Sequence, residues 1–239
     1  MAKNIHINNL HVEEHLKSSD FITDIVIGMS DGLTVPFALA AGLSGAVQSN
    51  SVVITAGIAE IVAGSIAMGL GGYLAGKTEQ EHYQSELARE YEEVEVVPER
   101  EKDEVREVFA RYGLKETTRD TIAEELARDK DKWVDFMMKY ELGLEKPDAN
   151  RARNSAATIG FSYIIGGLIP LSAYFFTPAP YQGLIISALL TIICLFVFGF
   201  FKSRVTGQNE IKGAVKVTII GIAAATAAFL IAKAFNTYF

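Results

Sequence analysis

The chain has 239 residues, of which 49% are hydrophobic and 21% charged, and its formal net charge is −7. The acidity is confined to one segment: Lys77–Asn150 holds 13 basic and 22 acidic residues, whereas the other 165 residues hold 9 and 7. We expect no nucleic acid among the partners of so acidic a chain. Because Cys194 is the single cysteine, a disulfide framework and a thiolate metal cluster are excluded, and we expect Cys194 only to pack.

Outside the acidic segment the chain consists of apolar runs that are long enough to cross a membrane. A spanning helix needs about 20 apolar residues, and five runs reach that length. They are Phe21–Val47, Ser51–Gly76, Arg153–Phe176, Gln182–Ser203 and Lys212–Asn236. We therefore predict an all-α membrane protein with five transmembrane helices per protomer, in contact with membrane lipid. Its predicted parts are residues 1–20, spans one and two in 21–76, a helical insert in 77–150, and spans three to five in 151–239.

The positions of Lys and Arg predict the orientation in the membrane, because positively charged loops stay in the cytosol. The links 48–50 and 177–181 carry no Lys or Arg, whereas the insert carries thirteen. The turn after span four carries Lys202, Arg204 and Lys212. We expect a cytosolic amino-terminal segment, a cytosolic insert and a lumenal carboxyl terminus. The first 20 residues are polar, so we expect no cleavable signal peptide.

The insert shows helical rather than strand periodicity. Its apolar residues recur every three or four positions, as in Val105, Val108, Phe109 and Tyr112. Breaks at Val97-Pro98, Tyr112-Gly113 and Gly143 to Pro147 predict three or four helices, the first of which continues out of span two.

Candidate metal ligands recur in the insert at a spacing of three residues, which places both side chains on one helix face. The pairs are Glu90 with Glu93, Glu101 with Glu104, and Met138 with Glu141. Carboxylate oxygens combined with thioether sulfur suit a borderline ion such as Fe²⁺ better than Ca²⁺ or Mg²⁺. The alternative interpretation of each pair is a solvated acidic face.

The insert lacks histidines at the spacing that a di-iron enzyme would need. Di-iron oxidases built on helix bundles follow a glutamate with a histidine three residues later, and the insert has only His82, which precedes the glutamate pairs. We therefore expect no ferroxidase activity and no prosthetic group. The amino-terminal segment contains His6, and it contains His11 and His15 at a helical spacing that could bind a metal ion.

The first two spans contain charged and sulfur-bearing residues at graded depth. Asp31 is a lone carboxylate in "GMSDGLTVPFALAAGLSG", and Glu60 and Met68 lie in "IAEIVAGSIAMGLGGYLAG". Measured from the cytosolic end at 1.5 Å per residue, Met68, Asp31 and Glu60 lie at about 12, 15 and 24 Å. Carboxylates inside a membrane usually mark ion or proton pathways, so we interpret the three residues as a transport pathway. A buried structural hydrogen bond for the carboxylates and simple packing for Met68 are the alternatives.

A pathway of three ligands predicts a symmetric dimer. A divalent transition-metal ion takes four to six ligands, and a two-fold axis would double three to six. The glycines of span two leave flat surfaces on which helices can pack closely. They are Gly57, Gly64, Gly69, Gly71, Gly72 and Gly76.

These segments together resemble the plant-type members of the vacuolar iron transporter family. The resemblance rests on "SDGLTVPFALAAGLSG" in span one, "AGIAEIVAGSIAMGLGGYLAGKTEQEHY" across span two, and a Glu-rich insert before three further spans. It implies a homodimer in the vacuolar membrane that moves Fe²⁺ out of the cytosol in exchange for H⁺. The pathway positions it implies are Asp31, Glu60 and Met68. The metal-binding positions it implies are Glu90, Glu93, Glu101, Glu104, Met137, Met138 and Glu141; Met137 is added by the resemblance alone, since its apolar stripe predicts core packing.

The functional prediction is thus a proton-coupled antiporter for ferrous iron, a secondary active transporter and not an enzyme. Metal and proton would alternate on Glu60, because a bound cation displaces the proton of a carboxylic acid. A membrane-anchored module for sensing or storing divalent metal, and a passive divalent-cation channel, are the alternatives. The residues leave open the choice among Fe²⁺, Mn²⁺, Co²⁺ and Zn²⁺, the number of ions in the insert, and the stoichiometry with protons.

Overall fold

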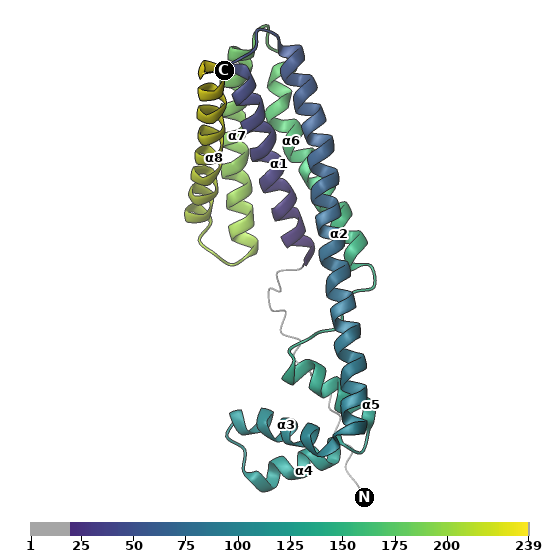
Figure 1. Cartoon of the computed structure of the whole chain (residues 1–239). Coiled ribbons are helices and arrows are strands. Elements are labelled where there is room, and N and C mark those ends of the chain that lie inside the picture. Colours follow the sequence, from purple (N-terminus) through teal and green to yellow (C-terminus); the bar gives the residue numbers. More distant parts are fainter. Residues whose placement is uncertain (1–19, 239) are drawn as a thin grey trace, which may run out of the picture. The chain divides into compact units, whose positions relative to one another are not determined.

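A computed structural model describes residues 20–238, and within that range the chain forms helices and no strands. The predictions for the amino-terminal segment concern residues outside the described range, including His6, His11 and His15. The elements are α1 (Asp20–Ser44), α2 (Asn50–Val96), α3 (Pro98–Arg111), α4 (Glu116–Leu126), α5 (Lys130–Phe136), the π-helical turn η1 (Met137–Glu141), α6 (Arg151–Phe175), α7 (Pro180–Val205) and α8 (Glu210–Tyr238) (Figure 1).

Five of these helices are long and apolar enough to cross a membrane: α1, α2, α6, α7 and α8. Their bounds agree with the five predicted spans to within a few residues, except that α2 continues to Val96, as predicted for the helix that leaves span two. Proline and glycine residues mark the two ends of α7. Pro180 opens α7, where its missing N–H costs no hydrogen bond. Gly207 follows the end of α7 with φ +66°, a left-handed conformation that glycine adopts without strain.

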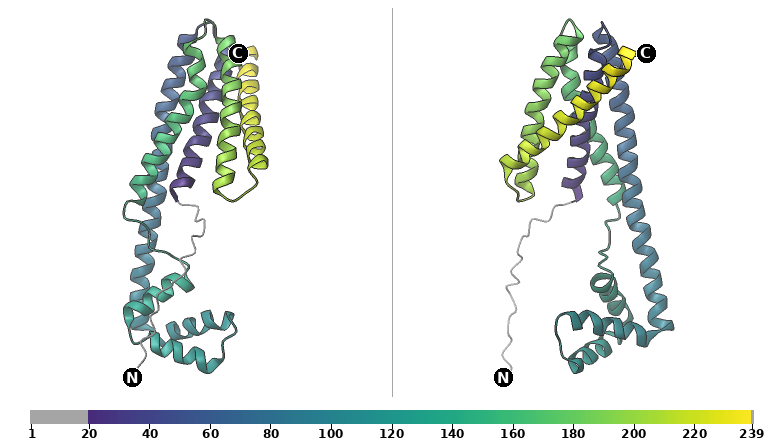
Figure 2. Two further views of the ribbon diagram at one scale, coloured as in Figure 1. Left: turned by 180° about the vertical axis from the view of Figure 1, so that it is seen from behind. Right: turned by 60° about the vertical axis from the view of Figure 1, so that its left-hand side comes forward.

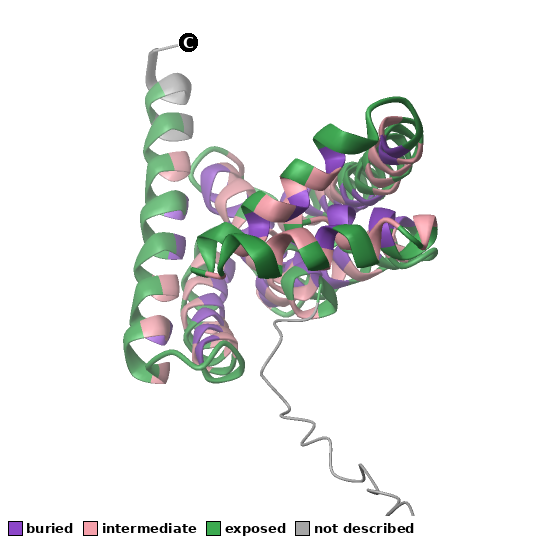
Figure 3. Cartoon of the chain, turned by 90° about the horizontal axis from the view of Figure 1, so that it is seen from below, coloured by how far each residue is buried: buried purple, intermediate pink, exposed green. Residues whose placement is uncertain are grey.

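The described chain divides into two units, one comprising the residues up to Gly69 with those from Ala157 onward, and the other Leu70–Ala156. In the first unit, α8 packs against both α7 and α1 (Figure 2). The buried residues of α8 lie on the side that faces its neighbours, and its other side is exposed (Figure 3). Exposed apolar side chains such as Leu189 and Ile219, at 62% and 60%, are what a lipid-facing surface requires.

Helices α1 and α6 approach so closely that their backbones meet at glycines. A Cβ atom on Gly28 would collide with the carbonyl oxygen of Ile159, and one on Gly32 with the backbone of Tyr163. A Cβ on Gly166 would lie 3.0 Å from backbone atoms of α1. Small residues allow this close packing of spanning helices.

Hydrogen bonds join the start of α2 to the end of α6. The side-chain amide of Asn50 donates to the carbonyl oxygen of Tyr174 at 3.0 Å and to Oγ1 of Thr177 at 3.2 Å. The hydroxyls of Tyr174 and Ser44 are 2.8 Å apart and both side chains are buried. In an apolar surrounding these polar groups must be satisfied within the protein, so the contacts hold the ends of α1, α2 and α6 together.

The second unit is a helical domain with its own core. Buried residues from its helices form one hydrophobic cluster: Val94, Val105, Ala123, Trp133, Val134, Met137 and Met138. Ion pairs connect α3 to α4, from Arg106 to Asp120 at 2.8 Å and from Lys102 to Glu124 at 3.0 Å. The predicted breaks at Val97-Pro98 and at Gly113, which has φ +77°, are confirmed.

Candidate functional site

Glu60 lies on α2 and accepts a hydrogen bond from a tyrosine of α6. The hydroxyl of Tyr163 donates to Glu60 Oε1 at 2.5 Å, and the Tyr163 side chain is 2% exposed. The second carboxylate oxygen, Oε2, is buried and has no hydrogen-bond partner in the described part of the chain. A buried polar atom without a partner indicates a site for an ion, a proton or water. Glu60 therefore has one oxygen fixed by Tyr163 and one oxygen available.

Two glycines make the space that Tyr163 occupies. Gly64 lies one turn after Glu60 on α2, and a Cβ there would be closer than 3.0 Å to the ring and hydroxyl of Tyr163. Gly32 follows Asp31 on α1 and meets the Tyr163 backbone. Tyr163 thus contacts the helices that carry both predicted pathway carboxylates. Of the glycines predicted for close packing in span two, Gly57, Gly64 and Gly76 meet Leu171, Tyr163 and Ala152 of α6, whereas a Cβ on Gly71 would meet nothing within 4 Å.

Asp31 is half-buried, on a side of α1 that the described chain leaves open. Ile27 and Val35, one turn before and after it, are 39% and 45% exposed. Met68 is also half-buried, two turns after Glu60 on α2. The structure gives the position of each residue, and their joint action as metal ligands remains a prediction.

Two polar side chains of the spans, Tyr163 and Asp24, were not predicted from the sequence as buried. Tyr163 stands in an apolar run, and the only available signal was that a buried tyrosine hydroxyl needs a partner. Asp24 is 3% exposed, so Asp31 is not the lone carboxylate of its span. Asp24 lies near the polar end of α1 and was not considered in the sequence analysis.

The glutamates of the insert come from three elements: α2 carries Glu90 and Glu93, α3 carries Glu101 and Glu104, and η1 carries Glu141. Glu90, Glu93 and Glu101 each offer one oxygen, and these oxygens lie within 4.8 Å of one another. Glu90 is 2% and Glu101 1% exposed, so a solvated acidic face does not describe these two residues. The helix break at Val97 changes the direction of the chain, and α3 places Glu101 beside Glu90 and Glu93 of α2.

Burial and mutual repulsion shift the ionisation of this cluster. Desolvation, followed by the charges of Glu104 and Glu90, raises the pKa of Glu101 to about 7. Desolvation and the same two neighbours raise the pKa of Glu141 to about 7 as well. The pKa of Glu90 is raised by burial and by Glu93. A site whose carboxylates repel one another in this way gains most from a bound cation.

Hydrogen bonds and ion pairs satisfy the rim of the cluster but not its centre. Arg100 contacts Glu104 at 3.2 Å and Arg89 contacts Glu93 at 3.6 Å, and both arginines are more than half exposed. Such exposed ion pairs contribute little to the free energy of unfolding. Among the described residues, buried oxygens without a hydrogen-bond partner include Oε2 of Glu90, both oxygens of Glu101 and Oε2 of Glu141. These unpaired oxygens are suited to be the carboxylate ligands of a divalent metal ion.

The two methionines are buried in the hydrophobic cluster of the insert, Met137 at 0% and Met138 at 1% exposure. The expectation of an α-helix through Glu141 is wrong in one respect, because residues 137–141 form a π turn. The N–H of Leu142 donates to the carbonyl oxygen of Met137, five residues earlier, at 3.1 Å. Such wider turns are frequent at functional sites. Core packing of Met137 agrees with its apolar stripe, and the roles of both sulfurs as ligands remain predictions.

Comparison with known proteins supplies the context of these residues. The sequence profile of the VIT family matches residues 22–233. The chain belongs to the VIT family. It is 51% identical to "Vacuolar iron transporter 1" of Tulipa gesneriana, over 94% of this chain and 91% of that protein. It is 49% identical to "Vacuolar iron transporter 1" of Arabidopsis thaliana, over 93% and 89%. It is 38% identical to "Protein CCC1" of Saccharomyces cerevisiae, over 88% and 68%. The resemblance stated from the sequence is confirmed.

The stability of the insert in this VIT family member is predicted to fall as the pH rises. Glu101 and Glu141 have raised pKa values, so between pH 4.5 and 7 they ionise in the unfolded chain before they ionise in the folded one. Their stabilising effect is therefore present below pH 4.5 and lost above about 7. The pKa of Asp129 is lowered from 3.8, so its stabilising effect is lost only below that pH and does not contribute to the change between pH 4.5 and 7.

Trp133 is the single tryptophan of the chain and lies 4% exposed in the core of the insert, so its emission reports this unit in the full-length protein. Without metal, we expect the melting temperature to be lower at pH 8 than at pH 5.5 by about 5 °C or more. Saturating Co²⁺ should raise it more at pH 8 than at pH 5.5. A melting temperature that rises from pH 5.5 to 8 in chelator would contradict the repulsion argument.

Gly64→Ala is predicted to impair transport by displacing Tyr163 from Glu60. The added Cβ has no room beside the Tyr163 ring, so the hydrogen bond to Glu60 should be lost, and we expect metal uptake into proteoliposomes to fall about ten-fold. Gly71→Ala is the matched control on the same helix, because its Cβ would meet open space. Equal uptake by the two variants would show that the Tyr163 position does not matter.

Proposed function

We propose that this chain is a proton-coupled antiporter that moves Fe²⁺ from the cytosol into the vacuole, and thus a transporter rather than an enzyme. The names of its relatives support iron and the vacuole, and the chain spans most of their length. Five apolar helices support a multi-pass protein of the vacuolar membrane. The observation that carries the proposal is the available Oε2 oxygen of Glu60 within a spanning helix.

In the proposed exchange, Fe²⁺ and H⁺ occupy Glu60 in turn. Tyr163 donates to Oε1 and thereby fixes the carboxylate, leaving Oε2 to bind either cation. A proton on Oε2 removes the negative charge that attracts the metal, and a bound metal ion expels the proton. Asp31 and Met68 provide further ligands along the route, where a thioether favours softer transition metals over Ca²⁺ or Mg²⁺. Acid on the vacuolar side then promotes release of the metal.

The insert, in this proposal, binds the metal on the cytosolic side before transport. Its ligands are those predicted from the sequence: Glu90, Glu93, Glu101, Glu104, Met137, Met138 and Glu141. The unpaired oxygens of Glu101 and its neighbours support the assignment. Competition by Mn²⁺, Co²⁺ and Zn²⁺ against Fe²⁺ at this site is the measurement that ranks the metals.

The proposed topology follows the positive charges of the sequence. Residues 1–20 and the insert at 77–150 lie in the cytosol, residues 21–76 and 151–239 contain the spans, and the carboxyl terminus lies in the lumen. Accessibility of single cysteines to a membrane-impermeant reagent in intact vacuoles tests each side. An engineered cysteine in the insert should react only from the cytosol.

We propose that the transporter is a homodimer in which α1 faces its copy. Asp31 lies on the open stripe of α1 between Ile27 and Val35, and a charge that faces lipid is costly. With Cys194, the only native cysteine, replaced by alanine, Val35→Cys is predicted to cross-link two protomers. Leu189→Cys, on a 62% exposed position of α7, is the control that should remain uncrosslinked. Cross-linking of both variants to the same extent, or of neither, would contradict this interface.

The deciding experiment measures metal uptake and internal pH together in proteoliposomes with an acidic interior. The antiporter is expected to take up Fe²⁺ and release protons in a fixed ratio. A membrane-anchored sensing or storage module would give no flux. A passive channel would give metal flux that persists without a pH gradient and without proton release, and either result would overturn the proposal.

A further inference from the structure

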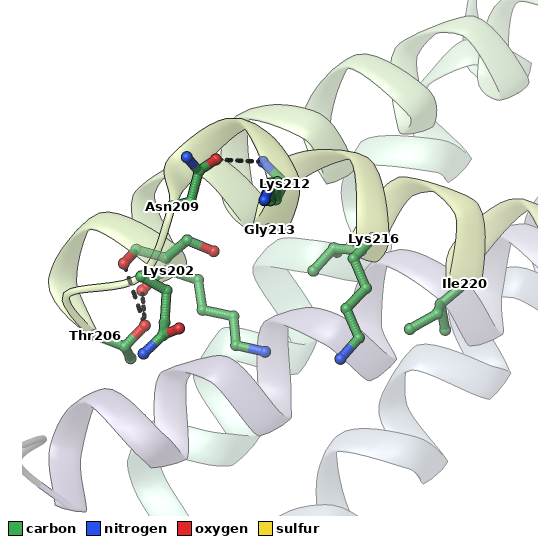
Figure 4. Close-up of a pocket in the computed structure, with 10 residues that line it drawn as sticks. Lys202, Thr206, Asn209, Lys212, Gly213, Lys216 and Ile220 are labelled. Atoms are coloured by element: carbon green, nitrogen blue, oxygen red, sulfur yellow. Dashed lines mark hydrogen bonds between the residues drawn. The ribbon is translucent and has the colours of Figure 1, made fainter.

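The turn that joins α7 to α8 encloses a basic cavity that no step of the proposed transport uses. Its volume is about 330 Å³. The lining is formed by the last turn of α7, the link, and the first turns of α8, and it includes Lys202, Lys212 and Lys216 (Figure 4). None of the ten lining residues is acidic. The cavity therefore presents three positive charges and no negative one.

The three lysines are not engaged by the protein itself. In the described residues, the ammonium groups of Lys202, Lys212 and Lys216 form no ion pair within 4.0 Å, unlike Lys102 and Lys132 of the insert. The polar groups around them bind one another. The hydroxyl of Thr206 donates to the carbonyl oxygen of Lys202 at 3.0 Å, and Asn209 Oδ1 accepts from the backbone N–H of Lys212 at 2.9 Å. The turn is held by these bonds, and the ammonium groups remain available to a ligand.

The frame of the cavity is closely packed. Ser203 is 6% exposed and Ala214 is fully buried, and a Cβ on Gly213 would collide with Ser203. Gly207, at φ +66°, and a hydrogen bond from the N–H of Gln208 to the carbonyl oxygen of Ser203 at 2.8 Å fix the turn. The lysines therefore project from a defined scaffold.

A shallow, open apolar groove on the surface of α8 continues from this cavity. It is lined by Ile211, Lys212, Val215, Lys216, Ile219 and Ile220, and its volume is about 500 Å³. Lys212, Lys216 and Ile220 line both spaces. The isoleucines are 57 to 60% exposed, on the surface of a helix that can span a membrane. The two lysines thus stand at the boundary between a polar and an apolar space, as the headgroup contacts of a lipid do.

We propose that this site binds one anionic phospholipid, with its phosphorylated headgroup in the basic cavity and an acyl chain in the groove of α8. Basic pockets between spanning helices are suited to anionic headgroups. Three lysines match a headgroup that carries several negative charges, such as an inositol phosphate, better than a single phosphodiester. The neighbouring apolar groove distinguishes a lipid from free phosphate, which would gain nothing from it. This site is independent of the metal route and of its coupling to protons.

The test measures binding of short-chain lipids to the full-length protein in detergent. We expect a dioctanoyl phosphatidylinositol phosphate to bind at least about ten-fold more tightly than dioctanoyl phosphatidylcholine. Each substitution Lys202→Gln, Lys212→Gln or Lys216→Gln should weaken binding about five-fold, and the triple variant about one hundred-fold. Replacement of all three by arginine should retain binding. Lys115→Gln with Lys132→Gln and Lys146→Gln removes the same charge from the insert and should leave binding unchanged.

Two further arms separate lipid from soluble phosphate. The inositol phosphate headgroup without chains should bind at least about ten-fold more weakly than the lipid, since burial of apolar surface contributes to lipid binding. Inorganic phosphate should displace the lipid only poorly. The proposal is overturned if the headgroup alone binds as tightly as the lipid, if phosphatidylcholine binds equally, or if the glutamine variants keep wild-type affinity. Should the triple variant fail to elute as a folded protein, the single substitutions and the arginine variant decide.

Discussion

Glu60→Gln is expected to abolish both metal uptake and the linked proton movement, lowering the initial uptake rate by about 100-fold or more. Loss of an outer-shell partner already costs 10–100-fold at metal sites, and here the ligand itself would lose its charge. Glutamine keeps an Oε1 that can accept the hydrogen bond from Tyr163. It can neither take up a proton nor neutralise a cation. The measurement is simultaneous Fe²⁺ uptake and internal pH in proteoliposomes under reducing conditions.

Companion variants assign the cause of that loss. Tyr163→Phe removes the hydrogen bond but leaves the charge, so a smaller loss of about ten-fold is expected. Asp31→Asn should resemble Glu60→Gln, because it also removes a charge from the proposed route. Met68→Leu should keep proton coupling but broaden the choice of metals, since it loses only the thioether. Normal uptake with normal proton release by well-folded Glu60→Gln would make Glu60 a structural residue and end the exchange mechanism.

Glu101→Gln combined with Glu104→Gln is expected to lower the affinity of the insert for divalent metal by about 100-fold, by the same reasoning on lost ligands. The substitutions should at the same time stabilise the metal-free protein at pH 8, because two repelling charges disappear from a buried cluster. Calorimetric titration with Co²⁺ gives the affinity, and the emission of Trp133 during heating gives the stability.

Glu99→Gln combined with Glu107→Gln is the matched control for this double variant. Both residues lie on α3, and both are exposed. The control should keep wild-type metal affinity and wild-type pH dependence. An unchanged metal affinity in the Glu101 and Glu104 variant would show that these residues are not metal ligands and form only a charged surface.

The sequence predicted the elements of this protein well because the signals are local. Apolar length marks the five spans, Pro98 marks the end of α2, and Gly113 marks the end of α3. The spacing of three residues correctly paired Glu90 with Glu93 and Glu101 with Glu104 on their helices. It could not predict that pairs on different helices converge, because convergence depends on how the helices pack.

The misses have the same physical origin. The hydrogen bond between Tyr163 and Glu60 joins residues that are 103 positions apart, and no periodicity reports such a contact. The π turn at Met137 closes a hydrogen bond over five residues where an α-helix closes one over four, and the apolar spacing around it does not distinguish the two. Asp24 lies in a stretch that composition alone classes as the edge of a span, yet the packing of α1 buries it.

The glycine contact between α1 and α6 has a consequence for how this family can vary. At Gly28, Gly32 and Gly166 the neighbouring atoms belong largely to backbone, which cannot rotate away as a side chain can. Alanine should therefore be tolerated almost as poorly there as lysine, whereas Glu101 should accept or reject replacements according to their charge. In a library of all single substitutions, these three positions would reject any larger side chain. The acidic cluster would instead reject substitutions that remove its negative charge. These two patterns would distinguish the residues that let the helices pack closely from those proposed to bind the metal.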